Sequence, residues 1–110
     1  MGGLTNIEWE NGLAEISLII DPSYRGGGRG RMAVQLLLDQ AFCRLRLETV
    51  FGEVYTINPA LDFWAKVARH YTADCTTLPR RKFWNGNLYS SMYFSITREG
   101  WADAERVQTA

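Results

Sequence analysis

Residues 14–30 read AEISLIIDPSYRGGGRG, and this stretch decides the fold. It opens with apolar and polar residues in alternation and continues through Leu18-Ile19-Ile20, apolar on both faces, as a strand central to a sheet does. Asp21-Pro22 then ends the extended run. The glycine-rich segment 25–30 follows directly, and a helical pattern begins after it. We therefore predict a strand, a glycine-rich loop and a helix in immediate succession.

The loop consists of Arg25-Gly26-Gly27-Gly28-Arg29-Gly30. Glycines let the backbone curl so that its N–H groups converge, and the N-terminus of the next helix adds unpaired donors and a positive dipole end. Such a cradle suits a pyrophosphate. Glycine is also common in loops between strands and helices for steric reasons alone. The loop can therefore be interpreted either as a pyrophosphate site or as a connection that binds nothing. Two other nucleotide-binding loops fit the sequence less well. A P-loop would end in Gly-Lys-Ser/Thr, and a dinucleotide-binding fold would have an acidic residue at the end of the next strand, and the sequence has neither.

The pattern predicts further elements on either side of the loop. Residues Leu4 to Trp9 and Leu13 to Asp21 form two extended runs about an Asn-Gly turn, which predicts a β-hairpin. The polar residues of Arg31 to Arg46 make only a narrow stripe, which predicts a helix buried over most of its surface. Thr49 to Ile57 is rich in β-branched and aromatic residues, so we predict a second central strand and a βαβ crossover.

The second half of the chain begins with Asn58-Pro59, which predicts a helix N-cap followed by proline at the first helical position. We expect strands near residues 71–78 and 89–97, with a turn at Asn85-Gly86 between them. Residues 101–110 are expected to have little structure. The apolar face of the predicted helix consists of Ala60, Leu61, Trp64, Ala65 and Ala68.

Composition limits the function further. A chain of 110 residues with 46% apolar content is long enough for one compact core. Its 12 basic and 12 acidic residues balance, so we expect no nucleic-acid or membrane-surface partner. No apolar run is long enough to span a membrane, and the start resembles no signal peptide. Cys43, Cys75 and the single His70 do not make a zinc site, and we expect reduced thiols, no metal and a cytoplasmic protein.

The loop and its surroundings resemble one family. Arg25-x-x-Gly28-x-Gly30 is similar to the Q/R-x-x-G-x-G/A pyrophosphate loop of the GNAT superfamily of N-acetyltransferases. The segments around it resemble the RimJ/RimL-type branch over residues 4–101, and we expect a single domain over 1–101 with a tail at 102–110. The segments that carry the resemblance are Ala14-Glu15-Ile16, Asn58-Pro59-Ala60, Arg80-Arg81-Lys82-Phe83-Trp84-Asn85-Gly86, Ser91 and Ser95-Ile96-Thr97-Arg98.

This resemblance implies an α/β (α+β) fold: a mixed, mostly antiparallel sheet with a central parallel strand pair and two main helices. The cosubstrate would be acetyl-CoA, with its pantetheine along Leu18, Ile19 and Ile20 and its pyrophosphate over the loop from Arg25 through Gly30. Arg25 and Arg29 could add charge or be ordinary surface residues. Asn58, at the start of the second predicted helix, would also belong to the cofactor site.

The sequence departs from the family pattern in its catalytic groups. In the family, the helix after the second central strand carries a tyrosine that protonates the leaving thiolate, whereas Trp64 stands here, and an indole cannot act as that acid. Trp64 is therefore expected in the core. Attack by an amine needs a base, for which Glu15 and Glu53 are the candidates. Tyr55 and Tyr93 could serve as acids, although aromatic strand residues more often only pack.

A second departure is that the family usually begins with a strand, two helices and another strand, which build the acceptor side and have no counterpart here. We expect a homodimer through the hairpin Leu4 to Leu13 to replace part of that wall. The leading hypothesis is an N-acetyltransferase acting on a protein amino terminus or a small amine. The alternatives are a coenzyme A-binding module without turnover, acting as a dimer, and a structural protein whose loop binds nothing.

Overall fold

The computed structural model describes residues 2–18 and 29–109. The chain divides into two compact units, residues 1–50 and 51–110, and each is described by itself. Five strands form one sheet in the order β1-β2-β3-β5-β4. The expected mixed, mostly antiparallel sheet with one parallel pair is confirmed. The expected single domain over residues 1–101 stays a prediction.

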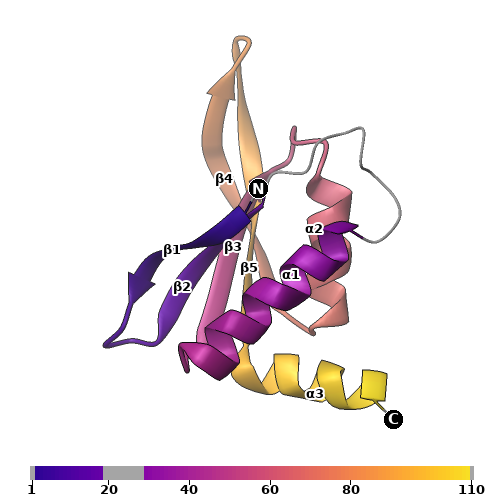
Figure 1. Cartoon of the computed structure of the whole chain (residues 1–110). Coiled ribbons are helices and arrows are strands. Elements are labelled where there is room, and N and C mark those ends of the chain that lie inside the picture. The colour runs from indigo at the N-terminus through magenta and orange to yellow at the C-terminus, as the bar shows by residue number, and fades with distance from the viewer. Residues whose placement is uncertain (1, 19–28, 110) are drawn as a thin grey trace. The chain divides into compact units, whose positions relative to one another are not determined.

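The first unit contains the predicted β-hairpin, in which β1 (Gly2–Glu8) pairs antiparallel with β2 (Leu13–Leu18) (Figure 1). Gly12 closes the turn at φ 67°, and its carbonyl accepts hydrogen bonds from the backbone N–H groups of Glu48 and Thr49 at 2.8 and 3.0 Å. A Cβ at Gly12 would lie 3.1 Å from the Glu48 nitrogen. Glycine is thus required twice, for the left-handed conformation and for the close approach of the backbone.

The first helix of this unit, α1 (Arg29–Asp39), continues into a π-helical segment (Gln40–Arg44) and contacts both strands of the hairpin. The helix predicted over residues 31–46 is present. The prediction that most of its surface is buried is wrong, because the side chains of Met32 and Leu36 are 61% and 67% exposed. A single layer of strands can cover only one side of a helix, and the apolar residues here extend beyond that side. The side chains buried in this unit are Ala14, Ile16, Val34, Leu38, Ala41, Phe42, Leu47 and Val50.

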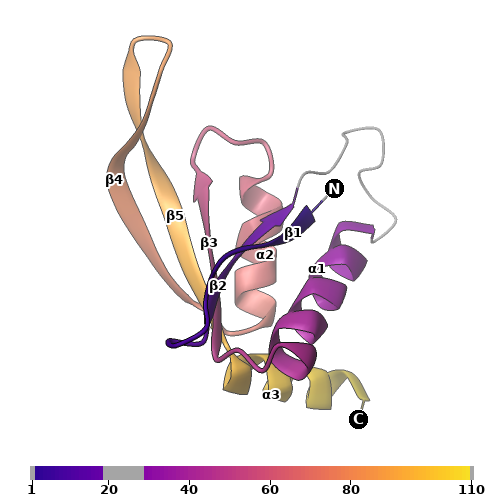
Figure 2. The ribbon, with the colours of Figure 1, turned by 60° about the vertical axis from the view of Figure 1, so that its left-hand side comes forward.

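The second unit is built around β3, which begins at the boundary, and two further strands. Its elements in chain order are β3 (Thr49–Tyr55), α2 (Leu61–His70), β4 (Asp74–Trp84), β5 (Asn87–Thr97) and α3 (Arg98–Thr109). β4 and β5 form a long antiparallel hairpin that closes at Asn85-Gly86 (Figure 2). Both turn residues have positive φ, 52° and 83°, as the predicted Asn-Gly turn requires.

β4 is an edge strand of the sheet and carries an irregularity. Its pairing with β5 shifts between Leu78 and Lys82, and Arg80 has a left-handed φ of 56° within that interval. Pro79 lies in the same interval, where the absence of an N–H costs no ladder hydrogen bond. Sequence reasoning placed a strand at 71–78. The structure starts it at Asp74 and carries it through the bulge to Trp84.

The core of this unit lies between α2 and the sheet. Trp64 is 7% exposed and stacks on Phe94 with ring centroids 5.4 Å apart, so its predicted place in the core is confirmed. Gly52 lies against the Phe94 ring, since a Cβ at residue 52 would be 2.5 Å from Phe94 Cζ. The buried side chains of the unit are Val54, Trp64, Val67, Ala68, Tyr71, Ser91, Phe94, Ile96 and Ala104.

Two predictions at helix ends are wrong. α2 begins at Leu61 rather than Pro59, because Asn58 Oδ1 accepts a hydrogen bond from the Ala60 N–H at 2.8 Å and forms a turn ahead of the helix. The expected weakly structured tail is α3. Thr97 Oγ1 accepts a hydrogen bond from the Gly100 N–H at 3.0 Å, which satisfies one of the free donors at the start of that helix.

Candidate functional site

The predicted cofactor residues fall at the junction between β2 and α1. Leu18 is the last residue of β2 and is half-buried, and Arg29 and Gly30 open α1. The backbone N–H groups of a helix's first turn have no partner within the helix, so Arg29 and Gly30 stand where an anion is favoured. The remaining predicted cofactor residues of this junction, Ile19, Ile20, Arg25, Gly26, Gly27 and Gly28, lie outside the described residues.

Asn58, the other predicted cofactor residue, lies in the turn ahead of α2. Its side-chain oxygen accepts the Ala60 N–H, and its carbonyl accepts the Leu61 N–H at 3.0 Å. These two contacts give Asn58 a defined structural role in directing the chain into α2. A role toward a cofactor stays a prediction.

The first candidate base, Glu15, lies on β2 between the buried Ala14 and Ile16 and points to the opposite face of the hairpin. Its Oε1 accepts a hydrogen bond from Asn6 Nδ2 at 2.7 Å. Asn6 has a left-handed φ of 49° at the point where the hairpin register shifts. The irregularity in β1 therefore brings the amide donor to the carboxylate.

The second candidate base, Glu53, belongs to the second unit and is more elaborately bound. Its Oε2 accepts a hydrogen bond from Ser91 Oγ at 2.6 Å and another from Arg81 Nε at 2.8 Å, and Arg81 Nη2 lies 3.4 Å from Oε1. The Glu53 side chain is 21% exposed and that of Arg81 48%. The hydrogen bond from Arg81, with that from Ser91, lowers the pKa of Glu53, and partial burial opposes this only in part.

The lowered pKa makes the Glu53 carboxylate better suited to carrying a negative charge than to accepting a proton. A carboxylate that stays ionised to lower pH is a weaker proton acceptor, whereas its negative charge is permanent near neutrality. Sequence reasoning found Glu53 but missed Arg81 and Ser91 as its partners, since they are 28 and 38 residues away in the chain. The alternation of β3 could have placed Glu53 away from the core, but no local pattern indicates its partners.

Aromatic side chains lie on the same face as Glu53. On β3, Val50, Gly52 and Val54 are buried toward the core, so Phe51, Glu53 and Tyr55 point to the opposite face. Phe51 stacks on Tyr93 with centroids 5.7 Å apart, and Lys82 Nζ lies 5.7 Å from the centre of the Tyr55 ring. Both tyrosines considered as acids therefore have packing or cation contacts, and neither contact shows a proton-transfer role.

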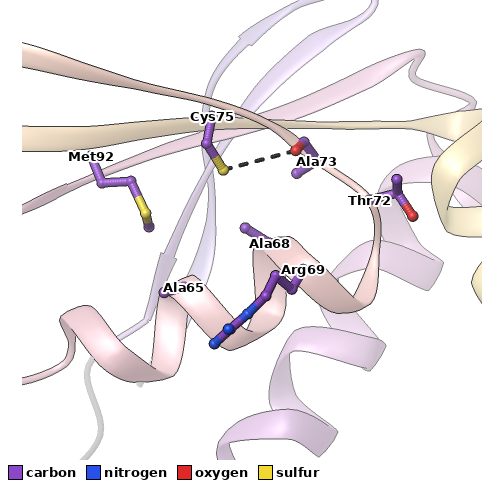
Figure 3. Close-up of a pocket in the computed structure, with 7 residues that line it drawn as sticks. All are labelled: Ala65, Ala68, Arg69, Thr72, Ala73, Cys75 and Met92. Carbon is purple, nitrogen blue, oxygen red and sulfur yellow. Dashed lines mark hydrogen bonds between the residues drawn. The ribbon is translucent and has the colours of Figure 1, made fainter.

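A separate hollow of about 410 Å³ lies on the other side of the second unit, between α2 and the start of the β4–β5 hairpin (Figure 3). Three alanines keep it open, while Met92 and Cys75 point into the space beside them. Cys75 Sγ contacts the carbonyl of Ala73 at 3.8 Å. Cys43 and Cys75 are both free thiols. The lining residues are Ala65, Ala68, Arg69, Thr72, Ala73, Cys75 and Met92.

Within residues 2–18 and 29–109, no group of three or more His, Cys, Asp or Glu side chains is placed to hold a metal ion. Among the same residues, no helix is both long and apolar enough to cross a membrane.

Residues 1–62, more than half of the chain, match the family model of the acetyltransferase (GNAT) domain. The chain therefore belongs to the GNAT acetyltransferase domain family. No curated protein matches the sequence significantly.

Solved structures share the fold. A variant of the spermidine N-acetyltransferase SpeG from Vibrio cholerae superposes with a TM-score of 0.78 at 23% identity, over 93% of this chain and 59% of that one. A second set of SpeG variants from the same organism gives 0.79 at 22%, over 93% and 58%. A probable acetyltransferase gives 0.76 at 23%, over 89% and 54%. The chain thus spans between about half and three fifths of the length of these proteins.

Proposed function

We propose that the chain binds acetyl-CoA and transfers its acetyl group to an amine, as a member of the RimJ/RimL-type branch. The observation that carries this proposal is the family match over residues 1–62, which contains the hairpin, the glycine loop, α1 and β3. The pyrophosphate would lie over Gly26 to Gly30, where the loop amides and the start of α1 would supply donors without any side chain. The pantetheine would pair with the backbone of Leu18, Ile19 and Ile20.

The reaction joins the amine nitrogen to the acetyl carbon and breaks the bond from that carbon to sulfur, so the thiolate leaves and one proton must be removed from nitrogen. A neutral amine is needed for the attack. Glu15 and Glu53 remain the two candidate bases of the proposal. Glu15, with a single amide donor, is the less constrained of the two, whereas Glu53 is held by a guanidinium and a hydroxyl.

A binding experiment tests the cofactor site directly. Calorimetric titration with acetyl-CoA should give saturable binding to the wild type and severely weaker binding to Gly28→Val, because the added side chain would obstruct the approach of phosphate to the loop amides. Gly3→Ala is the matched control, since a Cβ at Gly3 has nothing within 4 Å. Equal affinity of the wild type and a folded Gly28→Val variant would refute the placement.

The second candidate function is a coenzyme A-binding module without turnover. The burial of Trp64 favours it, because the residue that stands where the family carries its acidic tyrosine packs against Phe94 instead. Under this alternative acetyl-CoA binds, but no amine releases its thiol.

The proposal includes a homodimer through the hairpin and a cytoplasmic location. β1 is the last strand at its end of the sheet, and Trp9, in the hairpin turn, is 62% exposed. An unpaired strand edge beside exposed apolar side chains favours pairing with another chain. Ile7→Lys should then reduce the mass found by light scattering at micromolar concentration. A wild type that is already monomeric would remove the dimer from the proposal.

A further inference from the structure

We propose that the hollow between α2 and the start of the β4–β5 hairpin binds a short-chain aliphatic monocarboxylate. The hydrocarbon chain lies in the hollow, and the carboxylate lies at its edge on Arg69 and Thr72. The hollow is within the second unit, and its lining contains no residue assigned above to acetyl-CoA or to the transfer reaction. Binding of the carboxylate is therefore independent of the proposed acetyl transfer.

The interior of the hollow is apolar and has a size suited to a small molecule. Its volume of about 410 Å³ lies within the range of about 300–1,000 Å³ that is typical of small-molecule sites. Ala65, Ala68 and Ala73 present only methyl groups to it (Figure 3). Met92 reaches into it from β5, and its flexible thioether can adapt to the shape of a ligand. Burial of an aliphatic chain against these surfaces is favourable.

The end of α2 forms the polar edge of the hollow. The Ala73 N–H donates a hydrogen bond to the Ala68 carbonyl at 2.8 Å, and the Thr72 N–H donates one to the Arg69 carbonyl at 3.2 Å. With α2 ending at His70, these are the two hydrogen bonds of a Schellman motif. All four residues that they join line the hollow, so the helix terminus fixes the backbone of both Arg69 and Thr72 at its edge.

Thr72 is a costly residue for its place in this motif. Its φ of 54° is left-handed, and glycine is the usual residue at this position of a Schellman motif. A β-branched side chain is strained in that conformation, and residues strained in this way cluster at ligand sites. In return, Thr72 places on the lining of the hollow a hydroxyl that glycine lacks. The hydroxyl is assigned as a donor to the ligand carboxylate.

Arg69 determines the charge of the ligand. Among the described residues that line the hollow, it is the only one that carries a formal charge. Arg81 pairs with Glu53, whereas Arg69 has no ion pair within the part of the chain that the structure describes. A guanidinium presents a planar fork of N–H donors that matches the two oxygens of a carboxylate. An apolar hollow with this group at its edge suits an aliphatic anion and disfavours an aliphatic cation.

The probe is sodium hexanoate, with n-hexylammonium chloride as the control of opposite charge. Each is titrated without acetyl-CoA into the full chain carrying ¹³C-labelled methionine methyl groups, and binding is followed by NMR. The Met92 methyl resonance should shift saturably with hexanoate, because Met92 lines the hollow. Met32, on α1 of the first unit and 61% exposed, should not shift. Hexylammonium should bind more weakly than hexanoate.

Four variants test the assigned parts of the site. Arg69→Gln should weaken hexanoate binding about two- to fivefold, the effect of an exposed ion pair, and remove the preference over hexylammonium. Lys66→Gln removes an exposed charge one turn earlier on α2, outside the lining, and should bind like the wild type. Ala65→Leu fills the hollow and should abolish the Met92 shift. Thr72→Gly should raise the urea midpoint and yet weaken binding, which separates a ligand role from a structural one.

The proposal is overturned if hexanoate leaves the Met92 methyl resonance of the wild type unchanged, or if hexylammonium binds as tightly as hexanoate. It is also overturned if Arg69→Gln and Lys66→Gln bind hexanoate equally, or if a folded Ala65→Leu variant keeps the Met92 shift. Equal affinity of Thr72→Gly and the wild type would overturn the placement of the carboxylate. Since no acetyl-CoA is present, these failures are distinguishable from a failure of the proposed transferase activity, which acetyl-CoA titration reports.

Discussion

Substitution of Gly52 by alanine tests the packing of the second unit most sharply. A Cβ at this position would lie 2.5 Å from Phe94 Cζ, 2.9 Å from Cε1 and 3.1 Å from Cε2, against about 3.5–4.0 Å for carbon atoms at their preferred separation. The ring cannot retreat freely, because its other side stacks on the buried Trp64. Forcing one additional carbon into such a core typically costs about 1–3 kcal/mol.

Urea unfolding followed by circular dichroism measures this cost. With a denaturant dependence of about 1–3 kcal/mol per M, the Gly52→Ala midpoint should fall by about 1 M. Gly3→Ala, where the new methyl group meets open space, should stay within about 0.5 kcal/mol of the wild type. Replacing Phe94 by leucine as well should recover part of the loss, so the two changes should cost less together than their sum. A Gly52→Ala variant with the wild-type midpoint would refute the close contact between β3 and Phe94.

Three further predictions concern single side chains. Trp64→Ala should cost about 3–5 kcal/mol in urea unfolding, whereas Trp84→Ala, at a residue 55% exposed, should cost far less; equal losses would contradict the core position of Trp64. The pKa of Glu53 is lowered by Arg81 and Ser91, so its contribution to the free energy of unfolding is present above its usual pKa of 4.5 and is lost as pH falls through the lower native pKa. The stability difference between wild type and Glu53→Gln should therefore shrink in unfolding curves recorded from pH 6 down to acid, and a constant difference would argue against the ion pair. Thr97→Ala should lower the free energy of unfolding by about 1 kcal/mol, because the hydrogen bond that caps α3 is lost, whereas Thr97→Ser keeps the hydroxyl and should keep most of that stability. Equal stability of the two variants would show that the Thr97 hydroxyl does not stabilise the start of α3.

Much of the fold was predictable because its signals are local. The Asn-Gly turn at residues 85–86 and the glycine at residue 12 each mark a hairpin through backbone conformations that few other residues adopt. The order strand, loop, helix, strand from β2 to β3 likewise follows from changes in hydrophobic period along the chain. Trp64 was placed in the core by its helical spacing, together with the argument that an indole cannot act as the family's acid.

The misses have physical reasons that a single segment does not show. α3 was missed because its apolar residues are sparse, although Thr97 followed by Glu99 in the first turn was an available start signal. The exposure of Met32 and Leu36 depends on how much of the surface of α1 is covered by neighbouring elements. The sequence of the helix alone does not indicate that coverage. The partners of Glu53 were missed because a register shift in β4, not a spacing in the sequence, brings Arg81 to it.

The most direct test of the central claim is release of free thiol from acetyl-CoA in the presence of a panel of amines, with the acetylated amine identified by mass spectrometry. The account predicts thiol release that requires the protein and an amine together, yields the acetylated amine in equal amount, and falls sharply in Gly28→Val. Saturable acetyl-CoA binding with no thiol release for any amine, amino-terminal peptides included, would contradict acetyl transfer and leave the coenzyme A-binding module as the function.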